Sequence, residues 1–201
     1  MTRWYQEKKQ EHFYKKAKTE GYRARSAYKL KQIQKRFHVM KQGDTVVDLG
    51  AAPGGWSQIA SEIVGKHGLV VGIDLQKITP LEDIVFLQGD ITDKTSLTSL
   101  KRSIGDAGAD IILSDMAPNI SGNYSVDHAR SIYLSQMAFD VAKQLLVEQG
   151  NFVCKIFQGE LLQDFVSTVK NQFQSIKRYS PKASRKSSSE LYLIGKTFKN
   201  E

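Results

Sequence analysis

The sequence has little cysteine, no metal-binding pattern and no long apolar run, and each absence excludes a class of protein. A single cysteine, Cys154, cannot form a disulfide within the chain, and the four histidines are too scattered to suggest a zinc site. No stretch of about 18 apolar residues is present, and the polar, basic first residues lack the apolar core of a secretion signal. We therefore expect a cytoplasmic protein without a metal, a disulfide or a membrane partner.

Charge is distributed unevenly along the chain. Residues 1–41 carry 13 Lys/Arg against 3 Asp/Glu, residues 42–176 carry 9 against 16, and residues 177–201 carry 7 against 2. Aromatic side chains are interleaved with the first basic segment, namely Trp4, Tyr5, Phe13, Tyr14, Tyr22 and Tyr28. A solvated helix face or a disordered tail commonly explains a Lys-rich end. Two basic segments that flank one acidic region favour a polyanionic partner, most simply nucleic acid.

The apolar pattern predicts an α/β fold in a single domain over residues 1–201, with a basic extension over about 1–40 for contact with nucleic acid. Strand-like runs occur at 45–49, 69–73, 84–87, 109–113 and 151–157, and helical patterns at 25–38, 57–64, 95–104, 126–147 and 161–172. Ser26 is expected to cap the first of these helices. Strands separated by helices predict a mostly parallel, twisted sheet with helices on both faces. Two further strand-like segments, 175–179 and 191–195, predict an antiparallel strand at one edge.

Acidic residues follow the predicted strands. Asp48, Asp74, Asp90 and Asp115 each lie at or just after the end of a strand-like run. A single aspartate there is usually a turn former or a helix cap. Because ligands of open α/β sheets bind beyond the carboxyl ends of the strands, four such positions predict one acid-lined crevice.

The loop of sequence GAAPGG at 50–55 is neither the G-x-G-x-x-G of dinucleotide binding nor a P-loop, and a cluster of carboxylates would repel a pyrophosphate. A cationic ligand fits better. S-adenosylmethionine carries a sulfonium, an ammonium and a ribose diol, and Asp74 lies 20 residues beyond Gly54, about the separation expected of an acid that holds a ribose diol. Glycines here would let the backbone approach this ligand closely. Trp56 either borders the cofactor or packs in the core.

The residues expected opposite the methyl group limit which kind of atom can accept it. The segment SDMAPN at 114–119 lacks the Asp/Asn-Pro-Pro-aromatic run expected of enzymes that methylate an exocyclic amine. Methylation of a pyrimidine carbon needs a cysteine nucleophile, and Cys154 lies in the middle of a strand-like run, which favours a core position. An oxygen acceptor remains.

The chain resembles the FtsJ family of ribose 2′-O-methyltransferases over essentially its whole length. The resemblance rests on VDLGAAPGGWSQ (47–58), SDMAPN (114–119), VCKIFQG (153–159) and SRKSSSELY (184–192). It implies a Rossmann-like class I fold that uses S-adenosylmethionine. The implied catalytic residues are Lys29, Asp115, Lys155 and Glu190, and the implied cofactor contacts are Gly54, Trp56, Asp74, Asp90 and Asp115. Bacterial members methylate a uridine in large-subunit (23S-type) ribosomal RNA, so that RNA or the large ribosomal subunit is the expected partner of a monomeric enzyme, with transfer RNA as the alternative.

The physical roles of these residues can be argued from the reaction. Methyl transfer from a sulfonium is an in-line displacement, so the acceptor oxygen must be held about 3 to 3.5 Å from the methyl carbon and must lose its proton. We hypothesise that Lys155 accepts this proton and that Lys29 steadies the developing oxyanion. Desolvation and the like charge of Lys29 would favour the neutral form of Lys155, whereas the charges of Asp115 and Glu190 would favour its charged form, and the sequence leaves the net direction open. Asp115 and Glu190 would orient the two amines.

Two other classes of protein remain as alternatives. A non-catalytic RNA-binding or ribosome-assembly factor could keep the same fold, although the complete set of implied catalytic residues argues against it. A nicotinamide-dependent dehydrogenase is disfavoured because the G-x-G-x-x-G motif is missing and the crevice is acidic.

Overall fold

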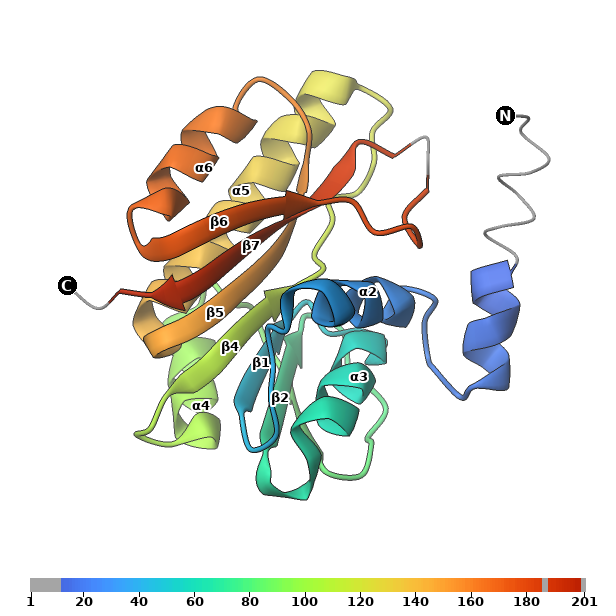
Figure 1. Ribbon diagram of the computed structural model, residues 1–201, viewed down its shortest axis with the longest axis vertical. Helices are drawn as coiled ribbons and strands as arrows, with labels where there is room; N and C mark the ends of the chain where they lie inside the picture. Colours follow the sequence, from blue (N-terminus) through green and yellow to red (C-terminus); the bar gives the residue numbers. More distant parts are fainter. Residues whose placement is uncertain (1–11, 186–187, 200–201) are drawn as a thin grey trace.

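The computed structural model describes residues 12–185 and 188–199 and is built around a seven-stranded sheet of order β3-β2-β1-β4-β5-β7-β6 (Figure 1). The strands are β1 Thr45–Leu49, β2 Leu69–Asp74, β3 Ile84–Gln88, β4 Ala109–Ser114, β5 Leu146–Phe157, β6 Phe173–Tyr179 and β7 Glu190–Phe198. Strands β1 to β5 pair in parallel, whereas β7 is antiparallel to both β5 and β6. The prediction of a mostly parallel sheet with an antiparallel strand at one edge is confirmed. Strand β7 inserts between β5 and β6, so β6 is outermost.

Helices cover both faces of the sheet. They are α2 Ala27–Phe37, α3 Gly55–Val64, α4 Lys94–Ile104, α5 Tyr124–Leu145 and α6 Leu162–Lys170, with a short 3-10 turn η1 at Gly65–His67. Helices α2 and α3 pack on one face, and α4, α5 and α6 pack on the other, each over its own cluster of buried apolar side chains. Burial on both faces explains why the strands read as continuous runs of Val, Ile and Leu.

A further helical segment, residues 12–19, stands beside α2. Ala17 is buried, and the Phe13 ring lies 5.4 Å from that of Tyr28, which also packs edge-on against Tyr22 at 5.8 Å. Three of the aromatic residues expected to face a polyanion therefore fix this segment to the body of the protein. Trp4, Tyr5 and the rest of residues 1–11, like Lys186, lie outside the described residues.

The period of the strands decides which polar groups share a face. Val153 packs in the α2 and α3 cluster and Cys154 in the opposite one, so Lys155 returns to the α2 side. Lys155 is the register partner of Tyr192 in β7, which also belongs to the α2 side. Alternation thus places both side chains under α2 at the carboxyl end of β5.

Neither a metal site nor a membrane-spanning helix is found in the part of the chain that the structure describes. Within residues 12–185 and 188–199, no group of three or more His, Cys, Asp or Glu side chains is arranged to hold a metal ion. No helix in the same part of the chain combines the length and apolarity needed to cross a membrane.

Candidate active site

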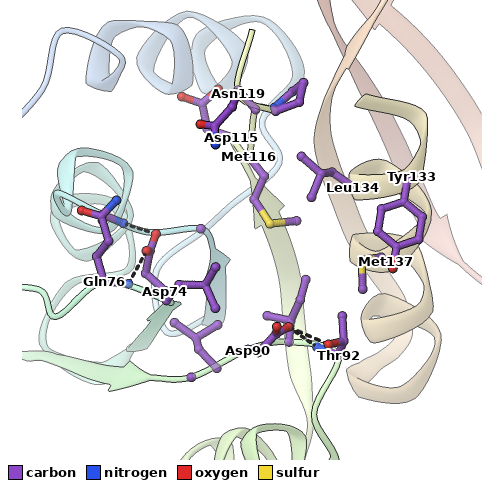
Figure 2. A pocket seen from close by; sticks show the side chains of 18 residues that line it. Asp74, Gln76, Asp90, Thr92, Asp115, Met116, Asn119, Tyr133, Leu134 and Met137 are labelled. Atoms are coloured by element: carbon purple, nitrogen blue, oxygen red, sulfur yellow. Dashed lines mark hydrogen bonds between the residues drawn. The ribbon is translucent and has the colours of Figure 1, made fainter. Parts of the chain in front are cut away.

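A cavity of about 650 Å³ opens beyond the carboxyl ends of the central strands (Figure 2). Three carboxylates line it, from Asp74 at the end of β2, Asp90 just after β3 and Asp115 just after β4. Its apolar lining comes from Ile73, Leu75, Ile91, Met116, Leu134 and Met137, among others. Carboxylates concentrated in one cleft favour a cation, and the apolar walls suit a flat ring.

Backbone donors fix the Asp74 and Asp90 carboxylates. One oxygen of Asp74 accepts from the Ala52 N–H at 3.0 Å and the other from the Gln76 N–H at 2.8 Å. Asp90 Oδ1 accepts from both the N–H and the hydroxyl of Thr92, each at 2.8 Å. A carboxylate oxygen can accept more than one hydrogen bond, so these groups are held in place and can still bind a hydroxyl or an amine.

The glycine-rich loop closes on the cavity at Gly50. Its φ of +70° is in the left-handed region, and a Cβ there would lie 2.3 Å from the Met116 side chain. Only glycine allows this approach. Gly54, with a φ of +107°, lies beside Arg23 and does not line the cavity.

Trp56 is buried beneath the loop and does not line the cavity either. Its indole Nε1 donates to the Ser26 carbonyl at 2.9 Å, and its ring lies 5.5 Å from that of Tyr192. Trp56 is thus a core residue, and it also lines a smaller pocket of about 40 Å³ with Gly50 and Asp115, so a contact with the cofactor stays a prediction. The predicted cap at Ser26 is wrong, because its side chain makes no capping hydrogen bond and its backbone is helical.

Arg23 is a contributor that the sequence did not reveal. Its guanidinium donates to the carbonyls of Pro53 at 3.1 Å, Thr79 at 2.5 Å and Pro80 at 2.9 Å. It therefore ties the glycine-rich loop to the loop that follows β2. Because Arg23 is one basic residue among many near the N-terminus, its spacing carried no signal of this role.

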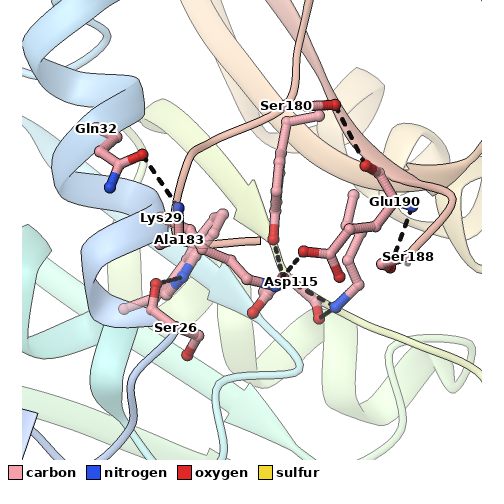
Figure 3. A network of polar contacts seen from close by, with 11 residues as sticks. Ser26, Lys29, Gln32, Asp115, Ser180, Ala183, Ser188 and Glu190 are labelled. Carbon is pink, nitrogen blue, oxygen red and sulfur yellow. Dashed lines mark hydrogen bonds and ion pairs between the residues drawn. The ribbon is translucent and has the colours of Figure 1, made fainter. Parts of the chain in front are cut away.

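Two buried ion pairs belong to one network of polar contacts, and one of them includes Asp115, which lines the cavity (Figure 3). Lys155 Nζ lies 2.9 Å from Asp115 Oδ1 and donates to the Asp115 carbonyl at 2.5 Å. Lys29 Nζ, from α2, lies 2.6 Å from Glu190 Oε1 at the start of β7. The Tyr192 hydroxyl also donates to Asp115 Oδ1, at 2.5 Å. The four residues implied as catalytic are therefore brought together, and Tyr192 joins them.

Burial and pairing set the charge of this group. Burial alone would raise the pKa of Asp115, but two lysine charges and the Tyr192 hydroxyl hold it below its ordinary value. Burial acts in the same way on Glu190, and the Lys29 charge lowers its pKa overall. Burial together with the Asp115 and Glu190 charges raises the pKa of Tyr192 well above its usual value. Tyr192 therefore stays a hydrogen-bond donor to a carboxylate.

Asp48 departs from the expected convergence of four aspartates. It lies inside β1 with 1% of its surface exposed, and its Oδ2 accepts from the Ser57 hydroxyl at 2.7 Å. Its Oδ1 has no hydrogen-bond partner. Burial, reinforced by the charges of Asp115 and Asp74, raises the pKa of this carboxyl to about 7.

Cys154 is fully buried on the other face of the sheet, and burial raises the pKa of its thiol. A buried thiol is a poor nucleophile. The prediction that Cys154 is a core residue is confirmed.

A mostly parallel sheet of this order with an antiparallel β7, and an acid-lined cavity at the carboxyl ends of its central strands, is the fold of a Rossmann-like class I methyltransferase. The chain belongs to the FtsJ-like methyltransferase family, whose model matches residues 22–198. It is therefore an S-adenosylmethionine-dependent methyltransferase.

Named relatives and a solved structure agree with this assignment. The chain is 55% identical over 186 residues to a protein of Methanothrix thermoacetophila named ribosomal RNA large subunit methyltransferase E. The aligned residues cover 92% of this chain and 72% of the relative. A protein of the same name from Halorubrum lacusprofundi is 53% identical over 92% of this chain and 69% of its own. A crystal structure described as a ribosomal RNA methyltransferase from Plasmodium falciparum has a TM-score of 0.81 at 29% identity and covers 90% of this chain and all of that one.

Proposed function

We propose that this protein transfers a methyl group from S-adenosylmethionine to the 2′-hydroxyl of a ribose, that of a uridine, in large-subunit ribosomal RNA. The observation that carries the proposal is the pair of buried ion pairs next to the acid-lined cavity, because an amine there could take the proton that an acceptor hydroxyl must lose. The large-subunit methyltransferases to which the chain is similar support this RNA as the substrate.

The cavity suits the cofactor. Asp74, with both oxygens fixed by backbone donors, would hold the ribose diol, and the apolar walls would enclose the adenine. Asp90 and Asp115 would add negative charge for a cationic ligand. When bound, S-adenosylmethionine supplies a methyl group on a sulfonium and leaves as a neutral thioether. Direct contacts from Gly54 and Trp56 remain predictions.

Lys155 is positioned to hold the acceptor. A neutral lysine amine has two N–H bonds and one lone pair, and the two N–H bonds would be donated to the Oδ1 and the carbonyl of Asp115. In this form, which Lys155 must reach before the reaction by releasing its own proton, the lone pair would face the 2′-hydroxyl. The hydroxyl oxygen would form its bond to the methyl carbon while the bond from that carbon to sulfur breaks, and the hydroxyl proton would pass to the Lys155 lone pair. Lys29, held by Glu190, would stabilise the negative charge that develops on that oxygen.

The approach of RNA is supported by two basic segments that meet in space. The Ala183 N–H lies 3.3 Å from Gln32 Oε1 of α2 (Figure 3). Ala183 also packs with Tyr28. Lys182 and Arg185 thus lie in a loop against α2, although the two segments come from opposite ends of the chain. Phosphates held by this surface would release counterions, so RNA binding should weaken steeply with salt.

The test is transfer of a labelled methyl group to undermodified large ribosomal subunits and, in parallel, to unmodified transfer RNA. Lys155→Ala should lose roughly a thousandfold in rate, whereas Lys143→Ala, which removes an exposed lysine of α5, should match the wild type. Label in transfer RNA alone would change the substrate and keep the chemistry. No label in any RNA would favour a non-catalytic factor. Retained activity and an unchanged pH-rate profile in Lys155→Arg would refute the proposed role of Lys155.

A cytoplasmic location and a monomeric state remain predictions. So does a single domain over residues 1–201 with a basic RNA-contacting extension over about 1–40.

A further inference from the structure

Tyr124 is an exposed aromatic residue linked by hydrogen bonds to the segments that carry the ion pairs. It begins α5, and 60% of its surface is exposed. Its hydroxyl donates to the Gln158 carbonyl at 2.6 Å, and the Gln158 N–H donates to the Ser189 carbonyl at 2.8 Å. Gln158 lies three residues beyond Lys155, and Ser189 directly precedes Glu190. Tyr124 is therefore bonded to one of the two segments that carry catalytic residues and is linked through it to the other.

The ring is held rigidly. Its plane lies within 13° of that of His128, with 6.4 Å between the ring centroids. His128 is itself buried, and its Nε2 accepts from the Leu161 N–H at 3.1 Å. At the helix start, the Asn123 side chain accepts from the Val126 N–H. A ring fixed at its hydroxyl and on one face loses little entropy when a ligand covers the other face.

No role already described accounts for this exposure. The other large exposed aromatics of the described residues are Tyr133, which lines the cofactor cavity, and Tyr14, in the segment 12–19. Tyr124 lies outside the cavity. Ile120, four residues before Tyr124, and Leu161, whose N–H donates to His128, are also exposed, at 66% and 45%.

We infer that Tyr124 is a stacking surface for an unpaired base of the RNA, on the acceptor nucleotide or directly beside it; this rests on the proposed function. A ribose at Lys155 brings its own base and those of its neighbours within a nucleotide's length of the Gln158 segment. RNA is recognised largely through unstacked bases placed on aromatic rings, and stacking is tolerant of sequence. The basic loop at 182–185 and the basic residues of α2 would hold the phosphates of the same strand.

The test combines variants of Tyr124 with RNA that lacks single bases. The acceptor nucleotide is first mapped with the wild-type enzyme, and abasic nucleotides are then placed at it and at each neighbouring position. Removal of one base should lower kcat/KM for RNA roughly tenfold in the wild type. Tyr124→Leu should show the same loss with intact RNA and no further loss with that abasic RNA, because the two changes remove one contact.

Three comparisons separate stacking from a structural effect. Tyr124→Phe keeps the ring and should retain most of the activity, and KM for S-adenosylmethionine should stay constant in all variants. Val85→Ala, an exposed residue on β3 far from β5 in the sheet, should match the wild type. A kcat/KM for RNA that falls as far in Tyr124→Phe as in Tyr124→Leu would overturn the inference.

The remaining outcomes are also decisive. Stacking is refuted and the proposed function stands if the wild type methylates RNA and Tyr124→Leu has the same kcat/KM. The same holds if the loss of kcat/KM in Tyr124→Leu adds to the loss caused by every abasic position. Self-association that is lost in Tyr124→Leu, with unchanged RNA kinetics, would assign the surface to a protein contact instead. No transfer by the wild type would overturn both proposals.

Discussion

Replacing Asp48 with asparagine should change how the stability of the protein depends on pH. The carboxyl has an ordinary pKa of 3.8 and a folded pKa of about 7. Between these values the folded protein keeps a proton that the unfolded chain has released, so the free energy of unfolding falls as pH rises through this window. Asparagine has no proton to lose and keeps an oxygen that can accept from Ser57.

The magnitude follows from the same two values. From pH 5 to the folded pKa of about 7, each pH unit lowers the wild-type free energy of unfolding by about 1.4 kcal/mol relative to the variant. The free energy of unfolding of Asp48→Asn, minus that of the wild type, should therefore increase by about 3 kcal/mol between pH 5 and pH 8. Asp115 and Glu190 have lowered pKa values and so lend stability that is lost as pH falls, but they are present in both proteins.

Urea unfolding at pH 5, 6, 7 and 8, extrapolated to water, measures this difference. Ser57→Ala is the matched variant, because it removes the hydrogen bond that lowers the pKa of Asp48 and should extend the decline in the free energy of unfolding to higher pH. Curves for the wild type and Asp48→Asn that stay parallel from pH 5 to pH 8 would refute the reasoning.

Three further predictions concern single side chains. Tyr192→Phe removes the donor to Asp115 and should slow methyl transfer at saturating substrates roughly tenfold without changing KM for the cofactor; an unchanged kcat would exclude Tyr192 from the site. Gly159→Ala puts a Cβ 2.5 Å from the His128 ring and should lower the free energy of unfolding by about 1–3 kcal/mol in urea, a cost that an unaltered midpoint would contradict. Arg23→Ala frees the two loops beside the cavity and should weaken cofactor binding roughly tenfold by calorimetry, with wild-type affinity as the opposing result.

Much of the fold followed from local pattern. Strand and helix periods depend on neighbours in sequence, so the alternation of elements, the parallel sheet and the antiparallel β7 were all predictable. The cavity position followed too, because the carboxyl ends of parallel strands share one edge. Asp74, Asp90 and Asp115 were found for this reason.

Tertiary packing decided the rest. Lys29 meets Glu190 because α2 crosses the sheet near the start of β7, and no local pattern specifies that crossing. Asp48 also follows a strand-like run, yet the pleat turns it inward beneath α3, where burial changes its pKa. The sequence by itself determined which elements form and which side chains end each strand. Only the tertiary structure decided which of those side chains face the cavity, since that depends on contacts between segments distant in the chain.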